Sequence, residues 1–171
     1  MTERLIEQVC QEIATQKLKL FNTHALIKAQ GKNYVRNTQI RLILKPLIDG
    51  LLTHFRSKRS IENQLNQILS MLRSRSRSFT EGNSVSKEDE KFQLELGYTG
   101  GNILNLLCQL ELDLSNHDFS HLTVWQADLQ HANFHNSNFS YGILALGNAS
   151  TRCRVMLSEW CQLPSVPMVK C

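Results

Sequence analysis

The sequence lacks the features that would place it in a membrane or in a secretory pathway. It has no apolar run of about 18 residues, so no membrane-spanning segment is predicted. The N-terminal stretch includes Glu3, Arg4 and Glu7, which do not fit the apolar core of a signal peptide. We therefore expect a cytoplasmic protein without membrane attachment.

Motifs for bound cofactors and for catalysis are also missing. The five cysteines include no CxxC pair, a pattern that favours reduced thiols over a disulfide framework or a zinc site. The Gly31-Lys32 pair lacks the remaining residues of a Gly-x-x-x-x-Gly-Lys-Ser/Thr phosphate-binding loop. No order of Ser, His and Asp, or of Cys and His, nominates a nucleophile. We expect no cofactor, no catalytic residue and no enzymatic activity.

What the sequence does contain is a strong charge asymmetry. Residues 1–77 hold 14 Lys and Arg and 5 Asp and Glu, a net charge of +9, whereas residues 78–171 have a net charge of −5. A basic half could bind nucleic acid, but no recognised nucleic-acid-binding motif accompanies it. It could equally be the solvated face of helices, or the side that meets a partner domain.

Residues 1–73 have the apolar spacing of helices. Leu5, Val9 and Ile13 recur at intervals of four, which is typical of an amphipathic helix. Pro46 lacks a backbone N–H, so we expect a break or kink there. The clearest helix follows Ser60, with Ile61, Leu65, Ile68, Leu69 and Leu72 on one face.

Residues 74–96 read as a flexible linker. The stretch "RSRSRSFTEGNSVSKEDEKFQ", which begins at Arg73, is polar and poor in large apolar residues, so burial cannot offset its ordering entropy. Its three Arg-Ser pairs are too few to favour an RNA-binding or phosphorylated segment. A helix is predicted over 97–111, with Thr99 or Asn102 at its start. The preceding "GYTGGN" could hold an anion, although a turn with a helix cap fits it better.

From residue 112 onward the sequence repeats every five residues. Apolar–polar–apolar triplets separated by two polar residues predict short extended sides joined by corners, four to a coil. We therefore predict a mainly α N-terminal half followed by a short right-handed parallel β-helix of pentapeptide repeats over 112–141, which the 97–111 helix caps. The large apolar centres, which we expect to stack in a buried ladder, are Leu114, Phe119, Val124, Leu129, Phe134 and Phe139.

The four histidines at 117, 121, 131 and 135 are spaced as two HxxxH pairs. On one helix this spacing would bind a metal. The five-residue repeat instead places His121 and His131 at different corners. We therefore expect no metal site.

Three stretches carry a resemblance to a known family: "VRNTQIRLILKPLIDGL" (35–51), "FRSKRSIENQLNQILSMLR" (55–73) and the segment 97–139. They are similar to the segment that joins two parts of cyanobacterial NB-ARC (STAND-type) ATPases with WD repeats. In that family, a P-loop ATPase precedes a winged-helix and helical region. Pentapeptide-like repeats and a WD-repeat propeller then follow. The resemblance assigns residues 1–73 to the winged-helix end and helical region, and it brings no catalytic residue.

The sequence departs from this pattern in two places. The join between Arg73 and Leu96 is longer than the family's, and residues 142–171 show neither strand alternation nor a Trp-Asp signature. We expect that 142–171 are an atypical, poorly ordered tail. We also expect a truncated product that starts at an internal Met and changes frame near Tyr141.

The function predicted from the sequence is that of a non-enzymatic scaffold or interaction segment, a remnant of an NB-ARC/WD-repeat signalling protein with protein partners. The alternative is a small basic helical protein that binds nucleic acid. Oligomeric state is left open by the sequence.

Overall fold

Helices form most of the described structure. The computed structural model describes residues 2–80, 87–129, 132–140, 143–145 and 153–154. None of the described helices combines the length and apolarity needed to cross a bilayer. The elements in order are α1 (Thr2–Thr15), α2 (Leu20–Thr23), α3 (Asn33–Gln39), the π-helix η1 (Ile40–Leu44), α4 (Lys45–Phe55), α5 (Lys58–Thr80), α6 (Lys87–Gln109), β1 (Thr123–Trp125), β2 (Ile143–Ala145) and β3 (Cys153–Arg154).

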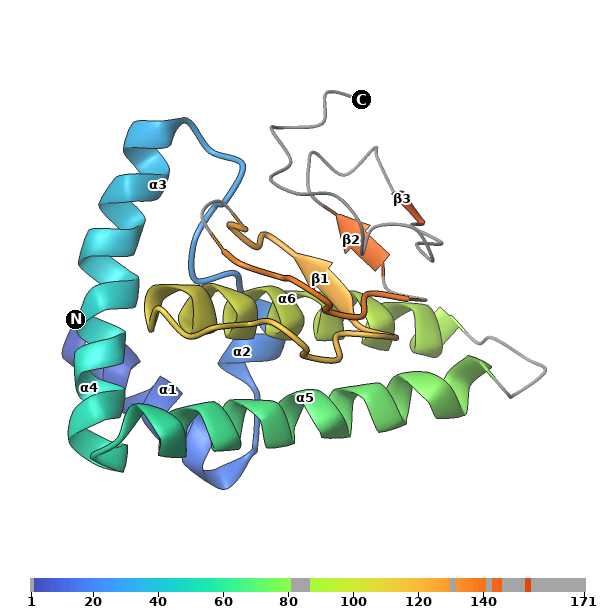
Figure 1. The fold of residues 1–171 in the computed structure, drawn as a ribbon, viewed down its shortest axis with the longest axis horizontal. Helices are drawn as coiled ribbons and strands as arrows, with labels where there is room; N and C mark the ends of the chain where they lie inside the picture. The colour runs from blue at the N-terminus through green and yellow to red at the C-terminus, as the bar shows by residue number, and fades with distance from the viewer. Residues whose placement is uncertain (1, 81–86, 130–131, 141–142, 146–152, 155–171) are drawn as a thin grey trace.

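A single hydrophobic core joins the helices to the segment that follows them. Figure 1 shows α5 and α6 as two long neighbouring helices, with α3, η1 and α4 at one end and β1 lying along α6. The predicted apolar face of α5 is fully buried, and so are Val9 and Ile13 of α1. Leu114, Phe119 and Val124 belong to the same cluster of buried side chains. The α-helices and residues 112–129 therefore share one core.

Pro46 does not interrupt its helix. The chain is helical without a break from α3 through η1 to the end of α4, and Pro46 lies in the first turn of α4. The wider turn of the π-helix lies immediately before it, where the backbone must make room for the proline ring. The chain is therefore helical through the position of the expected break or kink, with a local change of helix type just before Pro46.

The linker expected over 74–96 is wrong for the described part of that range. Helix α5 continues to Thr80 and α6 already begins at Lys87. These stretches have no apolar period of their own, but a helix that is anchored by apolar residues further along can continue through a polar stretch. Residues 81–86 lie outside the described residues.

The right-handed parallel β-helix expected over 112–141 is also wrong. Within the described part of that range, regular strand is limited to β1, whose three residues pair in parallel with β2. The next pairing, between β2 and β3, is antiparallel, unlike the ladder of a parallel β-helix. A three-residue side makes too few hydrogen bonds to form a ladder by itself, and α6 packs across β1 instead of further coils.

Two passes of the chain nevertheless lie side by side in this segment. Asp118 and Asn138 form an isolated parallel bridge. The backbone N–H of Phe119 donates to the Asn138 carbonyl oxygen at 2.7 Å, and that of Asn138 donates to the His117 carbonyl oxygen at 2.9 Å. The segment around Asn138 is thus held beside the segment around Asp118 by backbone hydrogen bonds outside any regular strand.

The five-residue period appears in the structure as a period of turns. Asp113, Asp118 and Asn138 each accept a hydrogen bond at 3.0 Å from the backbone N–H two residues later, and Asn133 makes the same contact at 3.2 Å. Short polar side chains favour such turns because they substitute for a backbone acceptor. A left-handed residue with positive φ also recurs every fifth position where the chain is described: Glu111, Asn116, His121, Gln126 and Asn136.

Most of the tail predicted over 142–171 lies outside the described residues. Only β2 and β3 are described within it. The expectation of poor order there stays a prediction.

Candidate interaction surface

Two adjacent glycines in α6 let β1 lie directly on the helix. A Cβ atom at Gly100 would stand 2.5 Å from the carbonyl oxygen of Thr123, and one at Gly101 would overlap the carbonyl oxygen of Trp125. The glycines are therefore needed for close backbone approach, not for a turn. Since α6 begins at Lys87, the predicted helix start near Thr99 is wrong, and this stretch has no free helix N-terminus for an anion.

Asn102 ties α6 to the loop after α2. Its side chain is 1% exposed, and its Oδ1 accepts a hydrogen bond from the backbone N–H of Leu26 at 2.8 Å. Its Nδ2 donates to the carbonyl oxygens of Phe21 at 3.1 Å and His24 at 2.7 Å. A buried amide with three backbone partners fixes the position of this loop on the helix.

Asn105 performs the same task on the next turn of α6, toward the C-terminal segment. Its Oδ1 accepts from the backbone N–H of Asp128 at 2.7 Å, and its Nδ2 donates to the carbonyl oxygen of Gln126 at 2.9 Å. Sequence reasoning missed Asn105 and gave Asn102 a different role, at the start of the helix. The available signal was two amides at i and i+3 among the apolar residues of a helix, where a polar side chain must find buried partners.

A largely buried ion pair closes the other side of this junction. Arg36 of α3 places Nε 3.1 Å from Oδ2 of Asp128, and both side chains are less than one-sixth exposed. The guanidinium also donates to the carbonyl oxygen of Ala29 at 3.3 Å and to Oδ1 of Asn33 at 3.2 Å. A charge in this setting requires such partners, so α3 and the 126–129 stretch hold one another in register.

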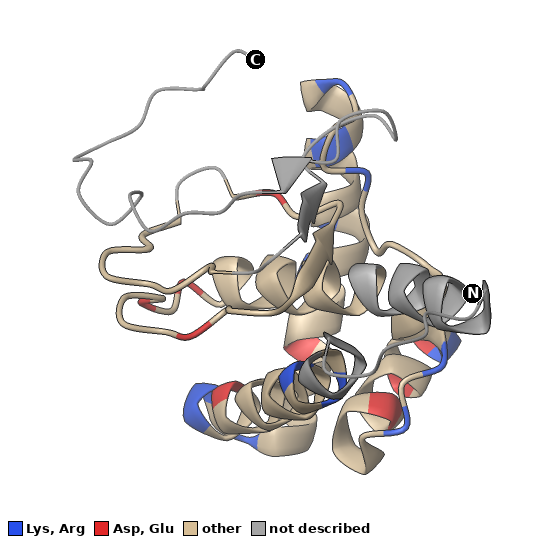
Figure 2. Ribbon diagram, turned by 90° about the vertical axis from the view of Figure 1, so that its right-hand side faces the viewer, with Lys and Arg blue, Asp and Glu red and all other residues tan. Residues whose placement is uncertain are grey.

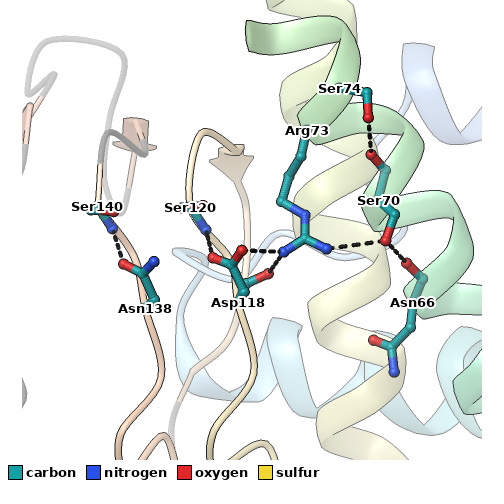
Figure 3. Close-up of polar contacts among 8 residues, drawn as sticks. All are labelled: Asn66, Ser70, Arg73, Ser74, Asp118, Ser120, Asn138 and Ser140. Carbon is teal, nitrogen blue, oxygen red and sulfur yellow. Dashed lines mark hydrogen bonds and ion pairs between the residues drawn. The ribbon is translucent and has the colours of Figure 1, made fainter.

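A second polar contact joins α5 to the corner at residue 118. Figure 3 shows the Arg73 guanidinium between Asp118 and Ser70. Its Nη1 lies 2.6 Å from both the carbonyl oxygen and Oδ2 of Asp118, and its Nη2 donates to Ser70 Oγ at 3.0 Å. The Asp118 side chain is 44% exposed, so solvent weakens this pair and its main effect is orientation.

Two further contacts run along the same side of α5. Lys58 Nζ donates to the carbonyl oxygen of Leu110 at 3.0 Å. Nε2 of His117 lies 3.7 Å from Oε1 of Glu62, a pair that is charged only when the histidine is protonated. The helical half and the C-terminal segment are thus joined on two faces, by α3 and α6 on one side and α5 on the other.

The six predicted repeat centres divide into two groups. Leu114, Phe119 and Val124 are fully buried, whereas Leu129, Phe134 and Phe139 are half-buried. Phe119 stacks on Phe139 with ring centroids 5.1 Å apart and meets Phe134 edge to face at 6.0 Å. The aromatic centres therefore touch one another, and the last three centres are partly exposed to solvent.

The described histidines form no metal-binding group with one another or with other ligands. Among the described residues, no three His, Cys, Asp or Glu side chains lie close enough to hold a metal ion. His117 lies beside Glu62 and stacks on Phe119, while His135 follows Asn133 in an exposed turn. His131 lies outside the described residues.

Comparison with known proteins adds one relative. No family model matches the chain, and no solved structure matches it. The chain is 51% identical over 121 residues to an uncharacterized WD repeat-containing protein of Nostoc sp. (strain PCC 7120 / SAG 25.82 / UTEX 2576). The aligned part covers 71% of this chain but spans only 8% of the relative's length. The predicted similarity to a cyanobacterial WD-repeat protein is confirmed, and its NB-ARC part stays a prediction.

The charge asymmetry of the sequence has a spatial counterpart. Residues 110–140 contain Asp and Glu but no Lys or Arg, and Figure 2 shows only acidic colouring on these loops. Residues 13–48 contain seven Lys and Arg and no acidic residue. Six of those seven are exposed, because only Arg36 is buried. The exposed charged side chains between α1 and α4 are therefore all positive.

Cys10 and Cys108 are shielded thiols. Burial, with a smaller contribution from the nearby Asp128 carboxylate, raises the pKa of Cys108 from 9.0 to about 11. Burial likewise raises the pKa of Cys10. A thiol is a nucleophile only as the thiolate, so neither cysteine has the environment of a catalytic residue.

We expect native Cys108 to resist alkylation at pH 8. A thiol pKa higher by about two lowers the thiolate fraction, and with it the rate, by about a hundredfold relative to the unfolded chain. Because the folded pKa is raised, ionisation of this thiol disfavours the folded state. The free energy of unfolding is therefore unaffected below pH 9 and falls as the pH rises toward 11. Iodoacetamide labelling followed by peptide mass mapping measures the rates. Equal labelling of the native and the urea-unfolded chain would contradict the assignment.

Proposed function

We propose that this chain is a non-catalytic, cytoplasmic interaction segment of a WD-repeat signalling protein. The observation that carries the proposal is how its buried polar side chains are used. Asn102, Asn105, Arg36 and Asp128 all bind the chain's own backbone or one another. Groups that fix one element on another build a rigid platform, whereas catalysis needs polar groups directed at a substrate.

The relative supports the same class of function. Its printed name describes a WD repeat-containing protein, and this chain matches a small part of it. WD-repeat propellers are radial arrays of strands, while this chain is mainly helical in its described part. We propose that the chain corresponds to a helical scaffold segment of such a protein, of the kind found beside NB-ARC (STAND-type) ATPases.

Affinity capture followed by reconstitution tests this function. The tagged chain is incubated with a cyanobacterial lysate, and each captured protein is then purified and tested for saturable binding to the purified chain. We expect at least one direct protein partner and no ATP turnover by the chain alone. Binding that is confined to DNA or RNA and weakens steeply with salt would favour the nucleic-acid alternative and overturn the proposal.

A further inference from the structure

A groove lies between the turn after α1 and the C-terminal half of α5. Its volume is about 250 Å³, which is below the range of about 300–1,000 Å³ typical of small-molecule sites. It is large enough to receive apolar side chains from outside. The described residues that line it are Gln16, Lys17, Leu18, Asn22, Ile68, Met71, Leu72 and Arg75.

The walls of this groove are held in place by polar contacts. Nε2 of Gln16 donates to Oε1 of Gln67 at 2.8 Å, which joins the turn to α5. The buried carboxylate of Glu12 accepts hydrogen bonds of 2.9–3.2 Å from the backbone N–H groups of residues 19–21, at the start of α2. The hydroxyl of Thr99 donates to Oδ1 of Asn22, which fixes the far wall on α6. A groove with fixed walls needs little ordering on binding.

Its floor is apolar and its described charges are all positive. Leu18, Ile68, Met71 and Leu72 form the floor, and Met71 is 37% exposed, one of only three large apolar side chains with that much exposure in the described part of the chain. The charged side chains among the described lining residues are Lys17 and Arg75. Methionine adapts its shape to different apolar side chains, a property used at binding surfaces.

We propose that this groove docks an amphipathic acidic segment of a partner protein. Apolar side chains of the segment enter the groove over Met71, while its carboxylates face the cationic side chains of the lining, Lys17 and Arg75. Helix-in-groove recognition combines these same two elements, an apolar anchor and a charged rim. The inference rests on the proposed interaction function and names its partner chemistry.

The composition of the groove favours a protein over a nucleic acid. Single-stranded nucleic acid is bound through aromatic platforms and a track of cations. The described lining contains no aromatic side chain and only two cations, and half of its residues are apolar. An acidic peptide matches both the charge and the apolar floor, whereas an oligonucleotide matches only the charge.

A fluorescence anisotropy titration tests the docking. The probe is a dye-labelled synthetic amphipathic helical peptide with leucines on one face and glutamates on the other, and the protein is the full chain. Lys17→Glu and Met71→Glu should each weaken binding by about tenfold or more, because one reverses a rim charge and the other places a carboxylate on the apolar floor. Lys32→Glu is the matched control, since it makes the same charge change at an exposed site outside the groove and should retain at least half of the affinity.

The possible outcomes distinguish failure of the docking groove from failure of the proposed interaction function. The groove proposal is overturned if all three variants lose affinity for the peptide equally, or if none of them loses affinity. It is also overturned if a single-stranded oligonucleotide displaces the peptide at low micromolar concentration. If a partner captured from lysate binds the Met71→Glu variant as tightly as the wild type, the groove is wrong while the interaction function stands. If no protein binds directly, the proposed function itself fails.

Discussion

Gly101→Ala should destabilise the protein by at least about 3 kcal/mol, since a new methyl group would occupy the position of the Trp125 carbonyl oxygen. Neither backbone can yield alone, because the same stretch of β1 is held by its parallel pairing with β2 and by the packing of Val124 in the core. Helix α6 and β1 must therefore separate. For a chain of this size we expect a fall in melting temperature of about 6–12 °C, measured by circular dichroism.

Gly50→Ala is the matched control for this prediction. It too adds one methyl group to a glycine within a helix, so both variants gain about the same 1 kcal/mol of helix propensity. A Cβ at Gly50 would meet Cγ2 of Ile6 at 2.5 Å, but Ile6 is a half-buried side chain whose methyl can turn away. We expect Gly50→Ala to be nearly neutral. Equal losses in the two variants would show that α6 and β1 do not depend on close backbone contact.

Helices with a strong apolar period were predictable because burial of that face determines the helix. Val9 and Ile13 of the α1 stripe and the face of α5 around Leu65 are buried as the spacing indicates, while Leu5 is half-buried. The polar ends of α5 and α6 look like a linker in the sequence, because composition alone does not show that a helix can continue once its apolar part is anchored. The helix ends were therefore the least predictable part of this half.

The C-terminal segment shows why a correct period can give a wrong fold. The spacing of five marks turns, each with a left-handed residue such as Asn116 or His121 and an Asx contact such as that of Asp118. Turns recur because each forms through contacts within a few residues, but a β-ladder requires hydrogen-bonded strands on both sides. Here α6 takes the place of one neighbouring strand of β1. Gly100 and Gly101, which let β1 approach the helix, look like turn residues in the sequence. Long-range partners of this kind leave no local signal.

The buried amides of α6 also have partners far away in the sequence, and Asn102 gives the last prediction. Asn102→Leu should destabilise the protein by about 3–5 kcal/mol, because it keeps a similar volume but removes every hydrogen bond of the amide. The backbone N–H of Leu26 and the carbonyl oxygens of Phe21 and His24 would lose their partner in the core. Each buried polar group left without a partner costs about 1–3 kcal/mol.

The measurement is urea unfolding of the wild type and the variant, with Asn63→Leu as the control. Asn63 is an exposed residue of α5, so the same replacement there removes no buried contact and should change stability by less than about 0.5 kcal/mol. Hydrogen exchange adds a local test, since loss of the Asn102 amide should expose the backbone N–H of Leu26 first. A variant that keeps both the wild-type midpoint and slow exchange at Leu26 would show that the loop after α2 is held by its apolar residues alone.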